Sequence, residues 1–334
     1  MLHTPLCDLL GIRYPIFQAP IGGTTRPELA AAVSNAGGLG SVAISHGSPD
    51  ALRAAIRRVR ELTAAPFAVN LLLPWPQEER VAVCLAERVP VLSLFWGDPA
   101  PFVSAAHAVG TRVLHQVGTV EEAERAAAAG VDAVIAQGVE AGGHVRGTIS
   151  LVALVPRVVD AVAPRPVLAA GGIADGRGIA AALALGAAGV SIGTRFLASV
   201  ESGAHPDYKA EVVAARETDT VFTELFDVGW PNAPHRSLRN STYEAWRAAG
   251  CPPPGRRPGE GDVVATHATT GQPVLRYTDR APVAELQGNI EAMALYAGQG
   301  CGLIDGVRPA GEIVAALVAE TEAALARLSA LARG

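Results

Sequence analysis

A histidine that follows two glycines is the strongest candidate for a reactive group in this chain. Residues 131–147 begin with consecutive apolar residues, continue through Gln137, Gly142 and Gly143, and then present His144. The apolar run predicts a strand buried on both faces of a parallel sheet, and chemistry in such folds lies in loops beyond the strands' carboxyl ends. Adjacent glycines let the backbone approach a ligand closely. We interpret His144 as a general base or a hydrogen-bond donor at a cofactor site, with a surface loop histidine as the alternative.

Two glycine-rich loops predict a phosphate site. Ala170-Gly171-Gly172-Ile173 follows one predicted strand, and Ser191-Ile192-Gly193-Thr194-Arg195 follows the next. Glycine N–H groups and a threonine hydroxyl can together form an anion nest, and barrel enzymes often bind phosphate after their seventh and eighth strands. Each loop could also be only a tight turn, but two at these positions favour phosphate binding. The chain has a single lysine, Lys209, so backbone N–H groups, hydroxyls or arginine must hold the phosphate.

Three side-chain amides end predicted strands at one edge of the sheet. These are Asn70, Gln116 and Gln137. A buried amide needs hydrogen-bond partners, which a polar ring system or the adjacent turn could provide. Three amides at the same end favour a polar, uncharged, ring-like ligand.

The elements that must position these residues alternate between strand and helix over the first two-thirds of the chain. Ser48-Pro49 and Asp98-Pro99 are typical helix starts, and Thr119 with Glu122 forms a capping box. The predicted strands are residues 14–19, 39–43, 67–71, 91–96, 112–117, 133–137, 167–170 and 189–192. This alternation predicts an α/β protein with a TIM (β/α)8 barrel, and an open doubly wound sheet is the alternative. A dinucleotide-binding fold is disfavoured because Gly37-Gly38-Leu39-Gly40 precedes a strand rather than following one.

The pattern changes after residue 200. We expect residues 1–200 to form the barrel, residues 201–281 to form a smaller inserted α/β region covering its mouth, and residues 282–334 to pack back as helices. Within these parts, 201–215, 282–297 and 310–332 are predicted helices, and 220–226, 263–266 and 273–277 are predicted strands. The turn-rich segment 229–241 is left without a strand. Trp230 and Tyr296 are interpreted as packing residues, with a place in the lining of a pocket as the alternative.

Composition excludes several classes of protein. A net charge of −5 argues against a general nucleic-acid surface. The four cysteines form no C-x-x-C pair, so the sequence indicates neither a zinc site nor a disulfide framework, and we predict no metal. No signal peptide or membrane-spanning run is evident, so we expect a soluble, cytoplasmic protein. A homodimer is left open.

The chain resembles the nitronate monooxygenase family, formerly called 2-nitropropane dioxygenases, which are FMN-dependent barrels. The resemblance spans almost the whole chain and is least secure over residues 227–281. The matching motifs are Pro15-Ile16-Phe17-Gln18-Ala19-Pro20 with Gly22, Gly37-Gly38-Leu39-Gly40, Val69-Asn70-Leu71, Ala136-Gln137-Gly138, Glu140-Ala141-Gly142-Gly143-His144, Ala170-Gly171-Gly172-Ile173-Ala174-Asp175-Gly176, Gly193-Thr194-Arg195-Phe196 and Ala297-Gly298-Gln299-Gly300.

This resemblance implies an FMN-dependent oxidation of alkyl nitronates by O2 to a carbonyl compound and nitrite. His144 would be the catalytic histidine. FMN would contact Ala19, Asn70, Gln137, Gly142 and Gly143, and its phosphate would lie on Gly171, Gly172, Ser191, Gly193 and Thr194. The chain departs from the family in one place: the family has arginine directly after the histidine, whereas here Val145 precedes Arg146. Arg146 could attract an anion or be only a solvated charge.

Other functions suit the same barrel. A related flavin enzyme could use NADH or NADPH to reduce an enoyl thioester, as the enoyl-acyl-carrier reductases with a similar Gly-Gly-His loop do, or could reduce a quinone. A flavin-free isomerase or aldolase is a different class, but Lys209 lies beyond the eighth strand, which disfavours a Schiff-base aldolase. A non-catalytic binding protein would have little use for a Gly-Gly-His loop beside a phosphate nest.

Overall fold

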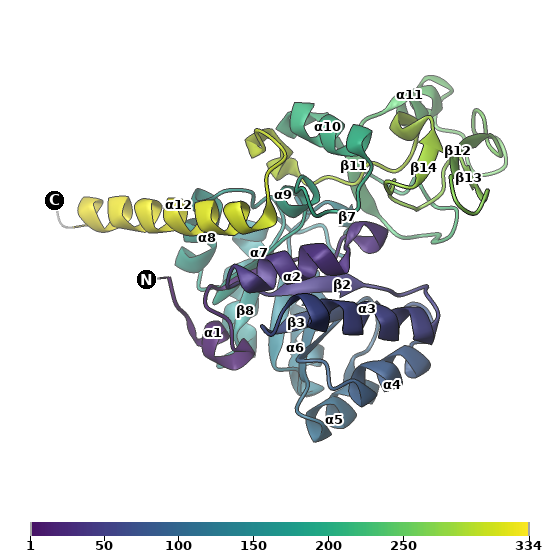
Figure 1. The fold of residues 1–334 in the computed structure, drawn as a ribbon. Helices are drawn as coiled ribbons and strands as arrows, with labels where there is room; N and C mark the ends of the chain where they lie inside the picture. The colour runs from purple at the N-terminus through teal and green to yellow at the C-terminus, as the bar shows by residue number, and fades with distance from the viewer. Residues whose placement is uncertain (1, 333–334) are drawn as a thin grey trace.

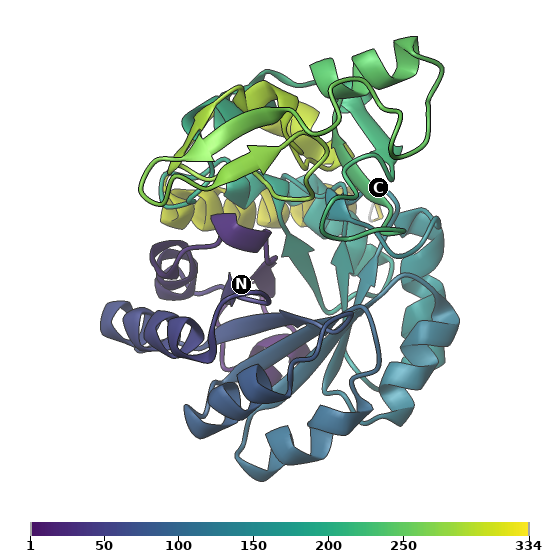
Figure 2. The ribbon, with the colours of Figure 1, turned by 90° about the vertical axis from the view of Figure 1, so that its right-hand side faces the viewer.

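The computed structural model describes residues 2–332, and eight parallel strands form its central sheet. Neighbour by neighbour, the strands are β1 (Ile16–Gln18), β9 (Gly189–Ile192), β8 (Val167–Ala170), β6 (Ala133–Gln137), β5 (Arg112–Val117), β4 (Val91–Phe95), β3 (Phe67–Leu72) and β2 (Gly40–Ala43). The first and last of these also meet, because the Leu39 N–H donates to Ile16 O and the Gln18 N–H donates to Leu39 O, both at 2.9 Å. The sheet is therefore the predicted barrel and not an open doubly wound sheet (Figure 2).

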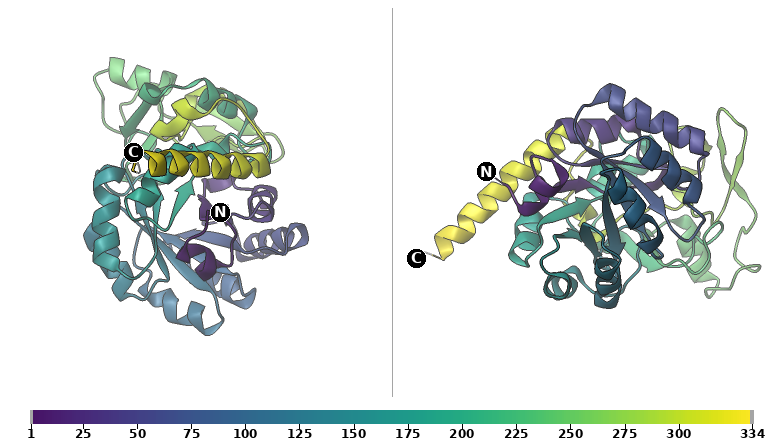
Figure 3. Two further views of the ribbon diagram at one scale, coloured as in Figure 1. Left: turned by 90° about the vertical axis from the view of Figure 1, so that its left-hand side faces the viewer. Right: turned by 90° about the horizontal axis from the view of Figure 1, so that it is seen from below.

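Helices cover the outside of the barrel. They are α2 (Pro27–Asn35), α3 (Pro49–Leu62), α4 (Glu78–Ala86), α5 (Ala100–Ala108), α6 (Val120–Ala128), α7 (Leu151–Val162) and α8 (Gly176–Ala184). Two predicted N-cap bonds form: Ser48 Oγ accepts the Ala51 N–H at 3.1 Å, and Thr119 Oγ1 accepts the Glu122 N–H at 3.2 Å. The reciprocal bond of the predicted capping box does not form, because Glu122 accepts the Gly118 N–H instead. Asp98 is not the N-cap of α5, although its Oδ1 accepts the Ala100 N–H at 3.0 Å. The helix directly after β9, α9 (Thr194–Leu197), is short. The longer α12 (Ala310–Leu331) covers this part of the barrel by packing against α8 and α2 (Figure 3).

A short helix that the sequence did not predict lies at the amino end of the barrel. In α1 (Pro5–Leu10), Leu6, Cys7 and Leu10 join the same apolar cluster as Phe17 and Leu39 from the barrel interior. This end of the barrel is therefore filled by apolar side chains, which leaves the opposite end for a polar site.

None of the helices within residues 2–332 is long and apolar enough to cross a lipid bilayer.

Alternation along the strands divides their side chains between two cores. On β6, Val134 and Ala136 pack with the surrounding helices, whereas Ala133 and Ile135 pack inside the barrel. Because side chains alternate with a period of two, Gln137 also points inward. The same parity turns further polar side chains inward near the carboxyl ends of their strands, namely Asn70, Ser93, Gln116 and Ser191.

A second layer of structure lies over the carboxyl end of the barrel (Figure 1). It holds α10 (Pro206–Ala214), α11 (Ser241–Ala248) and the short 3-10 helices η1 (Gly22–Thr24), η2 (Glu217–Asp219), η3 (Ile290–Ala292) and η4 (Gln299–Leu303). One small sheet has the order β10 (Thr220–Thr223), β11 (His235–Leu238), β7 (Gly143–His144), and the other has the order β13 (Pro273–Leu275), β12 (Val263–His267), β14 (Leu286–Gly288). The proposed division of the chain at residues 200 and 281 stays a prediction.

Two expectations for this layer are wrong. Residues 282–297 do not form an α-helix, because Gln287 and Gly288 pair with Thr266 and Ala265 of β12 and so use their backbone groups in a sheet. The turn-rich segment 229–241 contains β11, which pairs with β10 on one side and with β7 on the other. The second of these pairings joins the layer to the His144 loop.

Candidate active site at the mouth of the barrel

The loop that carries His144 is held from two sides. The Gln137 side chain donates from Nε2 to His144 O at 2.9 Å and accepts the Arg146 N–H on Oε1 at 3.1 Å. On the other side, the Val145 N–H donates to Pro234 O at 2.8 Å, next to the β7–β11 pair. Both polar atoms of Gln137 therefore serve the loop backbone, so this predicted cofactor residue also positions the histidine.

The two glycines before His144 are required for different reasons. A Cβ on Gly142 would lie 2.4 Å from Gly298 N, so no other residue fits between this loop and the chain near Gly298. Gly143 has a φ of 74°, in the left-handed region that glycine adopts without strain. The sequence motif thus encodes a close contact followed by a sharp change of direction.

Aromatic rings surround the His144 side chain. Trp230 stacks on the imidazole with centroids 4.1 Å apart and planes inclined by 28°, and Tyr296, His235 and Trp96 have centroids at 5.4, 5.4 and 6.2 Å. Trp230 and Tyr296, for which packing was favoured over a pocket lining, therefore contact the candidate catalytic residue. The Nε2 atom of His144 is buried and has no hydrogen-bond partner among residues 2–332.

The surroundings keep His144 uncharged. Burial, followed by the nearby His235, lowers the pKa of His144 to about 3. The imidazole is therefore neutral at pH 7, with one nitrogen able to donate a hydrogen bond and the other able to accept one. An anion placed beside the ring would raise this pKa again.

His235 is a second neutral histidine, directly opposite His144 in the β7–β11 pair. Its Nε2 accepts the Phe226 N–H at 3.4 Å, so Nδ1 carries the proton and donates to Ala233 O at 3.0 Å. Burial lowers the pKa of His235 to about 4. Sequence reasoning missed this residue because only the strand register brings it to His144.

The predicted phosphate loops lie side by side at the carboxyl ends of β8 and β9. Ala170 and Ser191 are paired in register, and Gly171 and Gly172 follow with φ angles of 119° and 69°. Ser191 Oγ is buried and has no partner within the described chain, which fits a hydroxyl that donates to a ligand oxygen. Thr194 Oγ1 accepts the Gly298 N–H at 3.0 Å, so this hydroxyl is partly committed to the protein.

The remaining predicted residues lie at the same end of the barrel, but the side chain of one of them points away from its interior. Asn70 donates from Nδ2 to Ser93 O at 3.1 Å, and Gln116 is partly exposed at the mouth. Ala19 is half-buried, and its N–H donates to Ile192 O at 2.9 Å. The Ile192 side chain points outward into the helix-facing core, so Ile192 could meet a cofactor only through its backbone.

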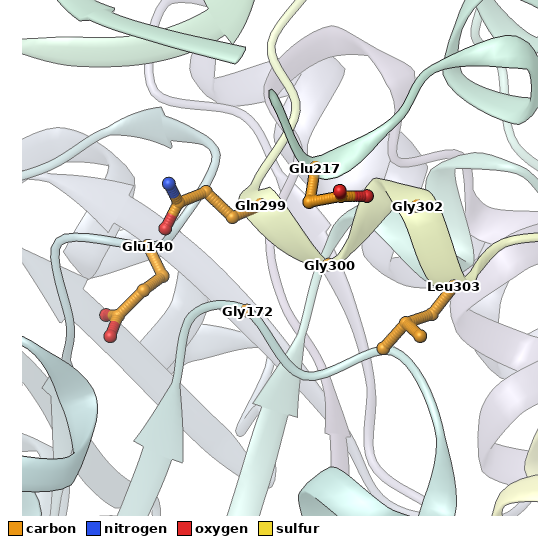
Figure 4. A pocket seen from close by; sticks show the side chains of 7 residues that line it. All are labelled: Glu140, Gly172, Glu217, Gln299, Gly300, Gly302 and Leu303. Carbon is orange, nitrogen blue, oxygen red and sulfur yellow. The ribbon is translucent and has the colours of Figure 1, made fainter. Parts of the chain in front are cut away.

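A hollow of about 400 Å³ lies beside Gly172. Its lining residues are Glu140, Gly172, Glu217, Gln299, Gly300, Gly302 and Leu303 (Figure 4). Its two carboxylates would repel a phosphate, so a phosphate is better accommodated at Ser191. Glu140 also accepts the Leu151 N–H at 3.0 Å on both carboxylate oxygens.

Val145 and Arg146, which follow His144, have different surroundings. Val145 is fully buried, and Arg146 Nε lies 2.8 Å from Glu122 Oε1. The Arg146 guanidinium also lies over the Trp96 ring, 5.3 Å from its centroid. Arg146 is exposed, which fits the interpretation as a solvated charge, now paired with Glu122. Attraction of an anion by Arg146 stays a prediction.

The comparisons with known proteins agree with this architecture. The family model described as nitronate monooxygenase matches residues 3–79 and 74–320. A nitronate monooxygenase of Pseudomonas aeruginosa is 38% identical, and the match covers 93% of this chain and 97% of that protein. The chain belongs to the nitronate monooxygenase family. It is therefore an oxidoreductase of a flavin enzyme class.

Other proteins similar over nearly the whole chain have names other than nitronate monooxygenase. An octahydroindene carboxyl-CoA dehydrogenase of Mycobacterium tuberculosis is 34% identical, and the match covers 99% of both proteins. The solved structure of FabK from Thermotoga maritima superposes with a TM-score of 0.83 at 35% identity, covering 99% of this chain and all of that one. Membership of the family thus fixes the enzyme class and leaves the substrate open.

Proposed function

We propose that this protein uses FMN to oxidise alkyl nitronates with O2 to carbonyl compounds and nitrite. The observation that supports it most directly is the neutral, unpartnered Nε2 of His144 at the barrel mouth, in a chain of this family. Two nitronate anions and one O2 give two carbonyl compounds and two nitrite ions. The C=N bond breaks, a C=O bond replaces it, and O2 takes up the electrons.

The residues at the mouth suit a flavin mononucleotide. The unpartnered Ser191 hydroxyl and the left-handed Gly171 and Gly172 would hold the phosphate, together with Gly193 and Thr194. Residues that would hold the ring system are Ala19, Asn70, Gln116, Gln137, Gly142 and Gly143. When bound, the flavin would accept electrons from the substrate and pass them to O2.

His144 would orient the substrate anion. A nitronate has already lost its α-proton, so it needs a hydrogen-bond donor rather than a base. Neutral His144 can donate from Nε2, and the arriving negative charge strengthens that bond as it raises the pKa of the imidazole. Without an anion beside it, His144 has a pKa of about 3 and would be a weak base toward a neutral nitroalkane. We therefore propose nitronates, rather than neutral nitroalkanes, as the substrates.

The test begins with the visible spectrum of the purified protein and the anaerobic addition of ethyl nitronate without nicotinamide. We expect a flavin spectrum that nitronate bleaches, and nitrite release when O2 is admitted. His144→Asn should retain the flavin and lose about 10²-fold in kcat/KM. His107→Asn, at a partly exposed histidine that pairs with Asp132, is the matched control.

Two results would count against the proposal. Unchanged turnover of His144→Asn would remove His144 from the mechanism. A colourless protein that cannot be loaded with FMN would remove the flavin reaction altogether.

A second candidate function is reduction of an unsaturated thioester with NADH or NADPH. It is supported by the coenzyme A dehydrogenase from Mycobacterium tuberculosis and by the FabK structure, both similar over nearly the full chain. The same spectrum separates the two functions: a flavin that ignores nitronate but is bleached by NADH or NADPH would favour the reductase.

A further inference from the structure

Three of the four tryptophans in the chain meet at the barrel mouth. Trp75 follows β3, Trp96 follows β4, and Trp230 comes from the second layer. Trp230 is the centre of the group, with ring centroids 4.7 Å from Trp75 and 4.9 Å from Trp96, both edge-on. The fourth tryptophan, Trp246, lies in α11 and donates from Nε1 to Pro252 O at 3.0 Å.

The Trp230 indole fills a slot whose floor is His144. It stacks on the imidazole at 4.1 Å, while the edges of Trp75 and Trp96 form two walls. Trp230 is only 8% exposed. Edge-to-face walls around a stacked ring are the arrangement that aromatic quadrupoles prefer. The structure therefore shows that a flat bicyclic ring fits against the candidate catalytic residue.

The Trp96 wall is held in place at a conformational cost. Trp96 has a φ of 62°, which is rare for a bulky residue and costs free energy unless the surroundings enforce it. The Arg146 guanidinium lies over its ring at 5.3 Å, and Arg146 is itself fixed by Glu122. The left-handed backbone and the Arg146 contact therefore both set the position of the Trp96 ring beside the slot.

We infer that the substrate carries a flat, apolar ring that takes the place of the Trp230 indole on His144, between the edges of Trp75 and Trp96. The inference rests on the proposed function for the reacting group and adds the class of its substituent. An aryl nitronate would place its anionic group beside His144 Nε2 and its ring in the slot. A short alkyl nitronate would leave the slot to Trp230.

Binding is tested without turnover by ¹⁹F NMR of the flavin-loaded protein labelled with 5-fluorotryptophan. Phenylacetate is the probe, because its carboxylate has the planar two-oxygen shape of a nitronate, and propionate is the alkyl comparison. Phenylacetate should shift the signals of Trp75, Trp96 and Trp230, leave that of Trp246 in place, and bind about tenfold more tightly than propionate. Equal affinities, or no shift of the three signals, would overturn the inference.

Trp96→Gly tests the wall itself. Glycine adopts a φ of 62° without strain, so this variant removes the ring while favouring the same backbone. The preference for phenylacetate over propionate should fall to below about threefold in this variant. Trp246→Phe is the matched control and should keep the wild-type preference. A Trp96→Gly protein that keeps the tenfold preference would contradict the assignment.

Turnover separates this inference from the proposed function. We expect kcat/KM for phenylnitromethane nitronate to exceed that for ethyl nitronate by about tenfold. Oxidation of both nitronates at equal efficiency would overturn the inference and leave the proposed function standing. Tight phenylacetate binding with no oxidation of either nitronate would overturn the proposed function and leave the aromatic-ring site standing.

Discussion

Ser191 projects from β9 into the mouth with a buried hydroxyl that has no partner in the described chain. A buried hydroxyl without a hydrogen bond costs free energy, so such a group is expected to meet a ligand. A hydrogen bond to a charged oxygen contributes about 1.5–3 kcal/mol. Ser191 is therefore the residue at which the proposed phosphate position is most directly tested.

Ser191→Ala should weaken FMN binding by at least about tenfold, because the phosphate loses one donor while the loop glycines remain. The measurement is a titration of flavin-free protein with FMN, followed by quenching of flavin fluorescence. Ser199→Ala is the control, since Ser199 is equally buried but already donates to Phe196 O at 2.6 Å. Equal FMN affinity of Ser191→Ala and wild type would move the phosphate elsewhere.

The sequence predicted those site residues that belong to short contiguous motifs, and missed those that contacts between distant segments bring to the site. The glycines before His144 and the loops after β8 and β9 are local motifs, and the structure brings them to one end of the barrel. His235 and Trp96 were not predicted as site residues, and a pocket role for Trp230 was only the alternative to packing. The positions of these residues depend on strand register, a left-handed backbone and a loop from the second layer. Each of these arises from contacts between distant parts of the chain.

At the scale of the element, the two-residue strand β7 joins the barrel to the second layer. Within residues 2–332 its ladder partner is β11 alone, and Gly142, just before it, packs against Gly298. The position of His144 therefore depends on two backbone contacts with parts of the chain far away in sequence.

Gly142→Ala tests this dependence. The added Cβ would meet Gly298 N at 2.4 Å, so the loop must shift, and we expect a loss of about 1–3 kcal/mol in stability and at least about tenfold in kcat/KM. Thermal unfolding and steady-state kinetics measure the two effects. Gly306→Ala, where no atom lies within 4 Å of the added Cβ, should change neither. A fully active Gly142→Ala would show that the loop tolerates displacement.

The elements of the barrel were predictable, whereas those of the second layer were not. Barrel strands are short apolar runs between capped helices, so a local pattern specifies each of them. β11 is a buried strand of His235, Arg236, Ser237 and Leu238. Because most of its side chains are polar, its sequence lacks the apolar pattern that predicts a buried strand. Residues 282–297 contain enough apolar residues for a helix, but their backbone pairs with β12. In both cases a partner strand, rather than the local sequence, determines the structure.

At the scale of the whole molecule, buried neutral histidines link stability to pH. Burial lowers the pKa values of His144, His235 and His115 to about 3, 4 and 4, while an unfolded histidine titrates near 6.5. Below pH 6.5 the unfolded chain thus binds more protons than the folded one, so stability must fall as the pH falls toward 4.

We expect each of the three histidines to remove about 2 kcal/mol of stability between pH 7.5 and pH 5. Denaturant unfolding of the protein across this range measures the sum. His115→Leu, which removes one of the three, should lessen the loss by about a third. A stability that stays constant from pH 7.5 to 5 would show that these imidazoles are not held neutral in the folded protein.

The closure of the barrel also governs when the chain can fold during its synthesis. β1 pairs with β9, so residues 16–18 cannot pair until the ribosome has added their partner strand, more than 160 residues later. The outer wall forms later still, because α12, which packs on α2 and α8, follows α2 by more than 270 residues in the chain. Until then the apolar faces of early strands and helices stay uncovered. A nascent chain should therefore expose apolar surface until β9 and then α12 have been synthesised, and slow decoding between these elements and their early partners would prolong that exposure.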